Sequence, residues 1–450
     1  MTKQNHKEPV TMDIKVTNSS KALSAAGGLL IFKPLLERSF QHIALSRSLP
    51  FGGPSRNHAQ KKFHHLVYSF LMGADCLDDC EVLGDDHTLR IVCPKVYSAK
   101  ALGDFLRSFA RVQCKELNRK LADLAFLLRP ILHERFHDNF ILDLDSTVNR
   151  QYGKKMEGVV ENYEGVRSLE TIQAFDEFGL QYWNEVRPGN TFSAEGAELI
   201  IHEVLSRMPK NSEYRGLRPI IRADSAFCNI NVFNACQSKN ADFVISMRAN
   251  MFSPLLKNVI SWQDQNPNKE NRILFYDGRE CQVGETLYFP ERSHKPFRVI
   301  IIRALKLGME NALFEHQDNY DYFSWVTTIG EHRMSWHKVI KFYRKRGQAE
   351  NYIRELKYNF DLKHYPCQRL SANNVYGTIA AFAYNFMRFL SVSRNKKHPC
   401  YAKQFRLRWL YLPCQVIHHA RQVSFKFMNH HYKEVVYWIE HIKNLQFGYT

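Results

Sequence analysis

The chain has 450 residues, of which 44% are hydrophobic and 24% charged, a composition of globular proteins with two or three domains that excludes disordered and fibrous classes. Lys and Arg number 62 against 45 Asp and Glu, and the formal net charge of +17 favours a polyanionic partner, either nucleic acid or an anionic membrane. The start lacks a signal peptide's apolar core, and no apolar run is long enough for a membrane span, which predicts a soluble intracellular protein.

The first third of the chain is predicted to be helical. Residues 29–36, 64–71 and 102–128 repeat apolar side chains with a helical period, and Ser98 is placed to cap the third segment. Basic residues in this part could face DNA, although no helix-turn-helix pattern is recognisable. We therefore treat residues 1–135 as one helical region.

The middle of the chain alternates predicted strands and helices. Apolar runs at 140–145, 169–175, 180–186, 219–224 and 242–247 are predicted strands, and residues 193–208 and 230–238 are predicted helices. This order favours a mixed sheet with parallel pairs, flanked by helices. The sheet domain is assigned to residues 136–250 and 337–395.

Residues 251–336 interrupt this pattern with short, aromatic-rich alternating segments, at 272–276, 285–289, 297–305 and 322–328. So long an insertion is not a plain loop, and it is interpreted as a β-rich subdomain. A buried helix is predicted at 374–392, and residues 396–450 are interpreted as a basic helical tail. Ten scattered cysteines without a CxxC pair indicate reduced thiols rather than a zinc site.

Two aspartates are placed by their strands at the edge of the predicted sheet. Asp145 and Asp224 each end an apolar run, and a carboxylate at the end of a buried strand is costly unless a cation answers it. Asp143 lies on the same strand face as Asp145 and is either a further metal ligand or a group that supports the ligands. With a third acid they would make an oxygen pocket suited to Mg²⁺ or Mn²⁺, and two ions would activate the attacking oxygen and stabilise the leaving one.

The third acid comes from a predicted helix at 343–358. At about 100° per residue, Tyr343, Arg346, Glu350, Arg354 and Lys357 share one narrow face beside an apolar flank. The ordinary alternative is a solvated helix in which Glu350 pairs with its two arginine neighbours for about 0.2–0.5 kcal/mol each. The next acid along, at position 355, points away from the stripe and is expected to be solvated.

These motifs resemble those of bacterial insertion-sequence transposases of the DDE class. The spacing Tyr343-x2-Arg346-x3-Glu350-x6-Lys357 matches their Y-R-E-K signature, and Asp145 and Asp224 stand in motifs similar to the first two acidic motifs. The resemblance covers roughly residues 140–395.

The resemblance implies a ribonuclease-H-like catalytic domain that binds transposon terminal inverted repeats, cleaves the ends and joins them to target DNA. It implies catalysis by the three acids with Mg²⁺ or Mn²⁺, and DNA phosphate binding by Tyr343, Arg346 and Lys357, to which Arg354 of the same stripe is added. Some relatives stack a flipped base on an insertion-domain tryptophan, a role that would fall to Trp325; an ordinary buried strand tryptophan is the alternative.

The function expected from the resemblance is cut-and-paste transposition, with a hairpin intermediate, by a homodimer on double-stranded DNA. The implied location is bacterial, cytoplasmic and nucleoid-associated, with end recognition assigned to residues 1–135. Two alternatives remain: a stand-alone metal-dependent nuclease of the same fold, which needs no phosphate clamp, and a non-catalytic DNA-binding protein descended from a transposase.

Overall fold

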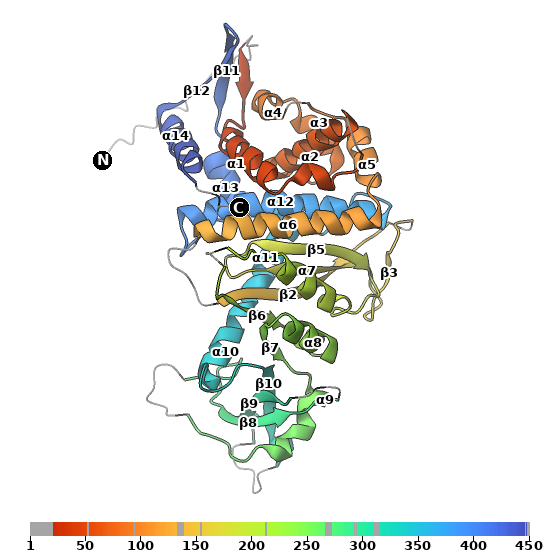
Figure 1. Cartoon of the computed structure of the whole chain (residues 1–450), viewed down its shortest axis with the longest axis vertical. Helices are drawn as coiled ribbons and strands as arrows, with labels where there is room; N and C mark the ends of the chain where they lie inside the picture. Colours follow the sequence, from red (N-terminus) through yellow and green to blue (C-terminus); the bar gives the residue numbers. More distant parts are fainter. Residues whose placement is uncertain are drawn as a thin grey trace, which may run out of the picture.

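The computed structural model describes residues 21–51, 54–93, 95–132, 139–153, 155–211, 214–265, 272–291, 293, 295–309, 316–445 and 447. Three tiers follow one another along its longest axis: a helical tier, a central sheet and a smaller β-rich tier (Figure 1). The first 20 residues of the predicted N-terminal region lie outside the described residues.

The described N-terminal region is helical from Leu29 on, whereas Ala22–Ser24 form a short strand where only helices were predicted. Its helices are α1 (Leu29–His42), α2 (Pro54–Met72), α3 (Leu77–Leu83), α4 (His87–Val92), α5 (Ala99–Arg107) and α6 (Arg111–Leu132). The predicted segment at 102–128 is two helices, and the side chain of Ser98 caps the first of them by accepting a hydrogen bond from the Ala101 amide.

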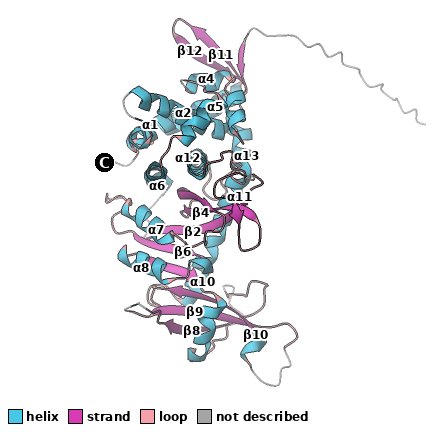
Figure 2. Cartoon of the chain, turned by 90° about the vertical axis from the view of Figure 1, so that its right-hand side faces the viewer, coloured by secondary structure: helices cyan, strands magenta, loops and turns pink. Residues whose placement is uncertain are grey.

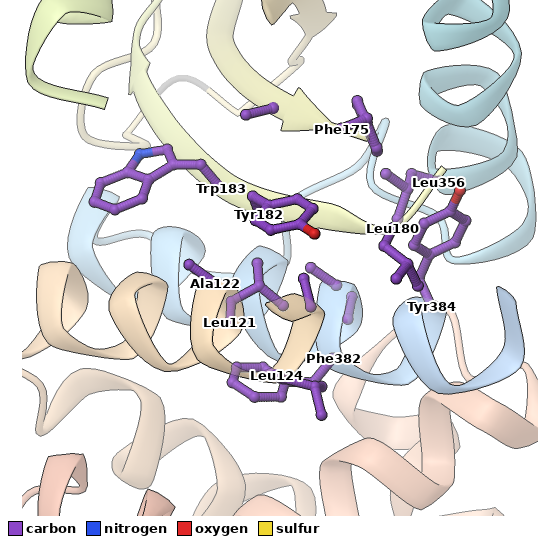
Figure 3. Packing of buried hydrophobic residues seen from close by; sticks show 14 of the residues in the cluster. Leu121, Ala122, Leu124, Phe175, Leu180, Tyr182, Trp183, Leu356, Phe382 and Tyr384 are labelled. Carbon is purple, nitrogen blue, oxygen red and sulfur yellow. The ribbon is translucent and has the colours of Figure 1, made fainter. Parts of the chain in front are cut away.

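Helix α6 shares a core with the sheet and with α12 (Leu370–Arg394), which confirms the buried helix predicted there. Figure 3 shows Leu121 and Leu124 of α6 facing Tyr182 of β5 (Gln181–Pro188) and Phe382 of α12. Because these side chains are buried together, the boundary predicted at residue 135 runs through a shared core instead of between two cores.

The central sheet is mixed, as predicted. Its strands run in the order β3-β4-β2-β6-β7-β10-β9-β8, with β5 beside β4, and only the β2–β6 and β6–β7 pairs are parallel. The strands other than β5 are β2 (Asn139–Arg150), β3 (Val160–Glu161), β4 (Arg167–Phe175), β6 (Arg218–Ala223), β7 (Asp242–Ser246), β8 (Gln282–Tyr288), β9 (Phe297–Leu305) and β10 (Tyr320–Thr327).

Helices flank the sheet on both sides. Helices α7 (Ala197–Ser206) and α8 (Ile230–Ser238) pack together on one side, and α11 (Gln348–Asn359) lies on the other (Figure 2). The predicted helix at 343–358 is interrupted: α10 (Trp336–Arg344) leads through a 3-10 turn, Lys345–Gly347, into α11. A glycine within the turn, unfavourable in a helix interior, is consistent with this break.

The insertion continues the main sheet. Strand β10 pairs antiparallel with β7 on one side and with β9 on the other, so β8–β10 extend the sheet into the lower tier (Figure 1). The strand predicted at 272–276 makes only an isolated bridge, Leu274 to Glu280, and the short helix α9 (Ala249–Phe252) precedes this tier.

The C-terminal part differs from the predicted helical tail. After α13 (Ala402–Phe405), strands β11 (Cys414–His419) and β12 (Gln422–Phe427) form a hairpin that pairs with β1 (Ala22–Ser24), and only then does α14 (Asn429–Lys443) follow. In the second half of β12, from Ser424 to Phe427, exposed and partly buried side chains alternate, the pattern of a strand and not of a helix.

Candidate active site

The two predicted aspartates meet where the parallel pairing of β2 and β6 ends. The last pair is Leu144 with Ala223, so Asp145 and Asp224 are the next residues of two adjacent strands. Strand β2 was predicted to end at Asp145. It continues to Arg150 because its other edge stays paired with β4. The acid therefore lies inside a strand that has lost one of its two neighbours.

The two carboxylates are held differently. Asp145 is 7% exposed, and its Oδ1 accepts a hydrogen bond of 2.9 Å from the Ser146 amide. Burial raises the pKa of Asp145 to about 6, against the charge of Arg346, and the neighbouring Asp224 raises that pKa further. Asp224 caps the following 3-10 turn, since its Oδ1 accepts a hydrogen bond of 2.8 Å from the Ala226 amide.

Arg346 connects the first acid to the third. Its Nη1 donates to Asp145 Oδ2 at 3.0 Å and its Nη2 to Glu350 Oε1 at 3.4 Å. The Glu350 side chain is 62% exposed, whereas that of Arg346 is mostly buried. The interrupted helix thus brings Glu350 to Arg346, whose guanidinium also binds Asp145.

Asp143 has a different partner. Both of its oxygens accept hydrogen bonds from Arg222, from Nε at 2.6 Å and from Nη2 at 2.7 Å, and the pair is buried. Arg222 Nη1 also donates to the Phe342 carbonyl at 2.7 Å. Because Arg222 engages both carboxylate oxygens, the supporting role fits Asp143 better than metal ligation does: it ties β2 and β6 to the end of α10.

Tyr343 and Trp325 lie in the interior. The Tyr343 hydroxyl donates to Ser246 Oγ of β7 at 3.0 Å, and burial raises the pKa of Tyr343 to about 12. Trp325 is 0% exposed, with its ring 5.8 Å from that of Tyr343. No base can stack on Trp325 in this conformation, because its ring is fully buried and packs against Phe323 and Tyr343; the structure matches the alternative of a buried strand tryptophan.

The remaining cations of the stripe differ in environment. Lys357 Nζ donates to the Val148 carbonyl of β2 at 2.9 Å, and burial lowers the Lys357 pKa against the charges of Glu170 and Asp145. Arg354 is exposed, and within the described residues the structure shows no ion pair for it. Of the four predicted phosphate ligands, it alone is fully presented to solvent.

One acid was misjudged from the sequence. Glu355 is 5% exposed, contrary to the expectation that it is solvated, and its Oε1 accepts a hydrogen bond of 2.6 Å from the Ala402 amide. Burial raises the pKa of Glu355 to about 7. The helix α11 contacts α13 there as well as the sheet and α12, so a second face of the helix is covered.

Two residues of the site were not predicted at all. Arg222 and Ser246 supply the partners of Asp143 and Tyr343, and both belong to buried strands. The available signal for Arg222 was its place inside an apolar run, Ile220 to Ala223, where a charged side chain needs a buried partner.

The carboxylates do not form a ready metal cage. Among the described residues, no group of three or more His, Cys, Asp or Glu is arranged to hold an ion. The donor set of Asp145, Asp224 and Glu350 nevertheless suits a hard cation such as Mg²⁺, because all its atoms are carboxylate oxygens. Arg346 binds two of the three, Asp145 and Glu350. All ten cysteines are free, as predicted.

Comparison with known proteins supports one family. A search of curated proteins finds no match. Within the described residues, no helix combines the length and the apolar character needed to cross a bilayer. The family model described as transposase DDE domain group 1 matches residues 8–446, nearly the whole chain. The chain therefore belongs to the family of DDE-domain transposases.

Proposed function

We propose that this protein is an active DNA transposase that cleaves transposon ends and joins them to target DNA through Asp145, Asp224 and Glu350. The observation that carries the proposal is the register of β2 and β6, which sets the two aspartates side by side, with Arg346 linking the first of them to Glu350. A ribonuclease-H-like arrangement of the sheet is part of the same proposal.

The three carboxylates would hold one or two Mg²⁺ or Mn²⁺ ions. When bound, such ions activate the attacking water or 3′-hydroxyl and stabilise the leaving oxygen. The chain's own residues have two roles at this site. Asp143 and Arg222 hold the edge of the sheet against α10. Arg346 neutralises the buried charge of Asp145.

Phosphate binding is assigned to Arg346, Arg354, Lys357 and Tyr343. Arg354 is exposed and can meet a phosphate directly. Arg346 and Lys357 each use part of their N–H groups on a protein oxygen, so a phosphate would share them with that partner or replace it. The buried hydroxyl of Tyr343 would reach DNA only after leaving Ser246. Base stacking on Trp325 likewise requires the side chains packed around its ring to move, so the hairpin route is the least supported step.

The proposed setting is a bacterial cell, with a homodimer joining two DNA ends in a cut-and-paste reaction near the nucleoid. A stand-alone nuclease of the same fold needs the carboxylates but not strand joining. A non-catalytic DNA-binding protein needs neither. The link from Asp145 through Arg346 to Glu350 favours a catalytic protein over a non-catalytic DNA-binding protein.

The test is a cleavage and joining assay on an end-labelled duplex that the unmutated chain has selected from a random library, with Mg²⁺ or Mn²⁺ present. Asp145→Asn, Asp224→Asn and Glu350→Gln should each remove nicking while leaving duplex affinity intact. Arg354→Met should instead weaken binding. Nicking that persists in Glu350→Gln would contradict the assignment, and nicking without joining would favour the nuclease.

A further inference from the structure

The hairpin of β11 and β12, which we call the C-terminal ribbon, projects from the end of the molecule opposite β8–β10 (Figures 1 and 2). Its base is anchored by β1, which pairs with β11 from Ala22 with Val416 to Ser24 with Cys414. Among the described residues, the outer three rows of the ribbon pair only β11 with β12.

The base of the ribbon is closely packed on the helical tier. Thr88 Oγ1 of α4 lies 3.7 Å from Cys414 Sγ. A Cβ added at Gly27, just before α1, would lie 2.4 Å from the Phe427 ring, so this glycine permits the contact. The ribbon is thus a fixed arm and not a loose loop.

The two faces of the ribbon differ in chemistry. Directly opposite residues of an antiparallel pair share a face, so the register of β11 with β12 assigns each side chain. One face has Cys414, Val416, His418, Val423, Phe425 and Phe427, and the other has Gln415, Ile417, His419, Gln422, Ser424 and Lys426. The second face is rich in amide, hydroxyl and ammonium groups, and Gln422, Ser424 and Lys426 are exposed.

The ribbon lies in an acid-free part of the chain. No Asp or Glu occurs between Asp361 and Glu434. The tip is a two-residue turn of Ala420 and Arg421, whose φ angles of 46 and 64 degrees favour Asn or Gly over a residue with a larger side chain. An exposed arginine thus stands at the tip in spite of its backbone conformation.

We propose that the C-terminal ribbon inserts its polar face into the major groove of double-stranded DNA. Paired strands lie about 4.8 Å apart, so two strands with their side chains fit a groove about 12 Å wide. Gln422 would contact base edges, because a glutamine amide pairs with adenine, and Lys426 and Arg421 would contact guanine or phosphate. The inference rests on the proposed function only in taking DNA as the partner, since the ribbon is separate from the carboxylates.

The surface fits DNA better than it fits a second copy of this chain. The exposed edge of β12 could add a strand from another molecule, but the exposed Lys426 and Arg421 on and next to that strand would repel the same residues of a copy paired there. Phosphates, in contrast, complement both charges.

The experiment uses the full chain and a duplex that it has enriched from a random library. Affinity for this duplex and for a scrambled one is measured at several salt concentrations for Gln422→Ala and Lys426→Ala. The matched control is Val423→Ala, because Val423 lies on the same strand but on the other face of the ribbon, and 42% of this residue is exposed. Circular dichroism and sedimentation verify folding and oligomeric state.

Gln422→Ala should lower the ratio of the two affinities about 5- to 100-fold while the scrambled duplex binds as before. Lys426→Ala should either lower that ratio or reduce the salt slope by about 1, and Val423→Ala should do neither. The proposal is overturned if no sequence is enriched, or if both polar variants bind as the unmutated chain does. It is also overturned if they change only the oligomeric state.

The failure of this inference is distinguishable from failure of the proposed function. Nicking of the enriched duplex at saturating protein depends on Asp145 and its partners, whereas sequence discrimination depends on the ribbon. If Asp145→Asn nicks normally and Gln422→Ala has a lowered ratio of affinities for the enriched and the scrambled duplex, the proposed chemistry is refuted and the role of the ribbon is supported. The reverse result would keep the chemistry and remove the ribbon.

Discussion

Replacing Arg346 with methionine is the sharpest perturbation of the candidate site, because one side chain answers two carboxylates. The variant keeps much of the apolar stem and removes the charge. Asp145 would then stay buried beside Asp224 with no guanidinium within hydrogen-bond distance. We expect the metal-free chain to lose stability and to bind Mn²⁺ more tightly.

The magnitude follows from the exposure of the partners. The side chains of Arg346 and Asp145 are 12% and 10% exposed, and removing one partner of a buried pair costs about 3–5 kcal/mol. The link to Glu350 adds only about 0–1 kcal/mol, because that side chain is 62% exposed.

The loss should depend on pH. The raised pKa of Asp145, about 6, means that its contribution to stability is present at low pH and is lost as the pH rises through 6. Removing Arg346 raises that pKa further, so the variant should lose about 3 kcal/mol at pH 8 and less at pH 5, where Asp145 is protonated more readily.

The assays are urea unfolding at pH 5 and pH 8 and titration with Mn²⁺, whose free concentration is read by electron paramagnetic resonance. Without a competing guanidinium, Mn²⁺ should bind roughly 10- to 100-fold more tightly, the equivalent of one charge-assisted hydrogen bond. Arg354→Met is the control, since it removes an exposed arginine from the same helix. Unchanged stability at pH 8 together with unchanged Mn²⁺ affinity would refute the reasoning.

Three further outcomes are expected. Asp145→Asn, Asp224→Asn and Glu350→Gln should abolish metal-dependent nicking in a gel assay and leave duplex affinity within about twofold, since charge loss at three carboxylates does not remove phosphate contacts. Glu355 has a pKa raised to about 7, so its contribution to stability falls as the pH rises through 7. In urea unfolding, the free energy of unfolding of Glu355→Gln should therefore rise by about 3 kcal/mol relative to that of the unmutated chain between pH 4 and pH 8. A difference between the two proteins that does not change with pH would contradict this. Trp325→Ala should cost about 3–5 kcal/mol in the same assay because the ring is fully buried, and a loss under about 1 kcal/mol would instead favour an accessible indole.

Part of the central sheet was predictable because its signals are local. Apolar runs ending in an acid gave β2 and β6, and the strict helical spacing gave Glu350 and its cationic neighbours. The family resemblance depended on the same short motifs, and the match over residues 8–446 confirms its broader part, a DDE-domain transposase.

Pairing was not predictable, because it depends on distant residues. Nothing local shows that Arg222 binds Asp143 or that Tyr343 reaches Ser246 across the sheet. The burial of Glu355 depends on α13, which packs on the second face of a helix assumed to have only one buried side.

The C-terminal ribbon shows a different failure. Its strands alternate, but the turn between them is Ala420 and Arg421, without the Asn or Gly that marks a hairpin in sequence. The third strand, β1, comes from the opposite end of the chain. For these two reasons, the sequence of this segment does not reveal that it forms a sheet.

Three of the hydrogen-bond donors on the stripe already have partners inside the protein, which bears on how the site works. Tyr343 binds Ser246, Arg346 binds Asp145, and Lys357 binds the Val148 carbonyl. A phosphate would compete with these partners for the donors, and a metal ion would compete with Arg346 for Asp145 Oδ2. The two exchanges are complementary, because the guanidinium released by a metal is the one that a phosphate needs. Since linkage is reciprocal, metal and DNA should each strengthen the binding of the other, which would keep the carboxylates neutralised and inactive until both are present.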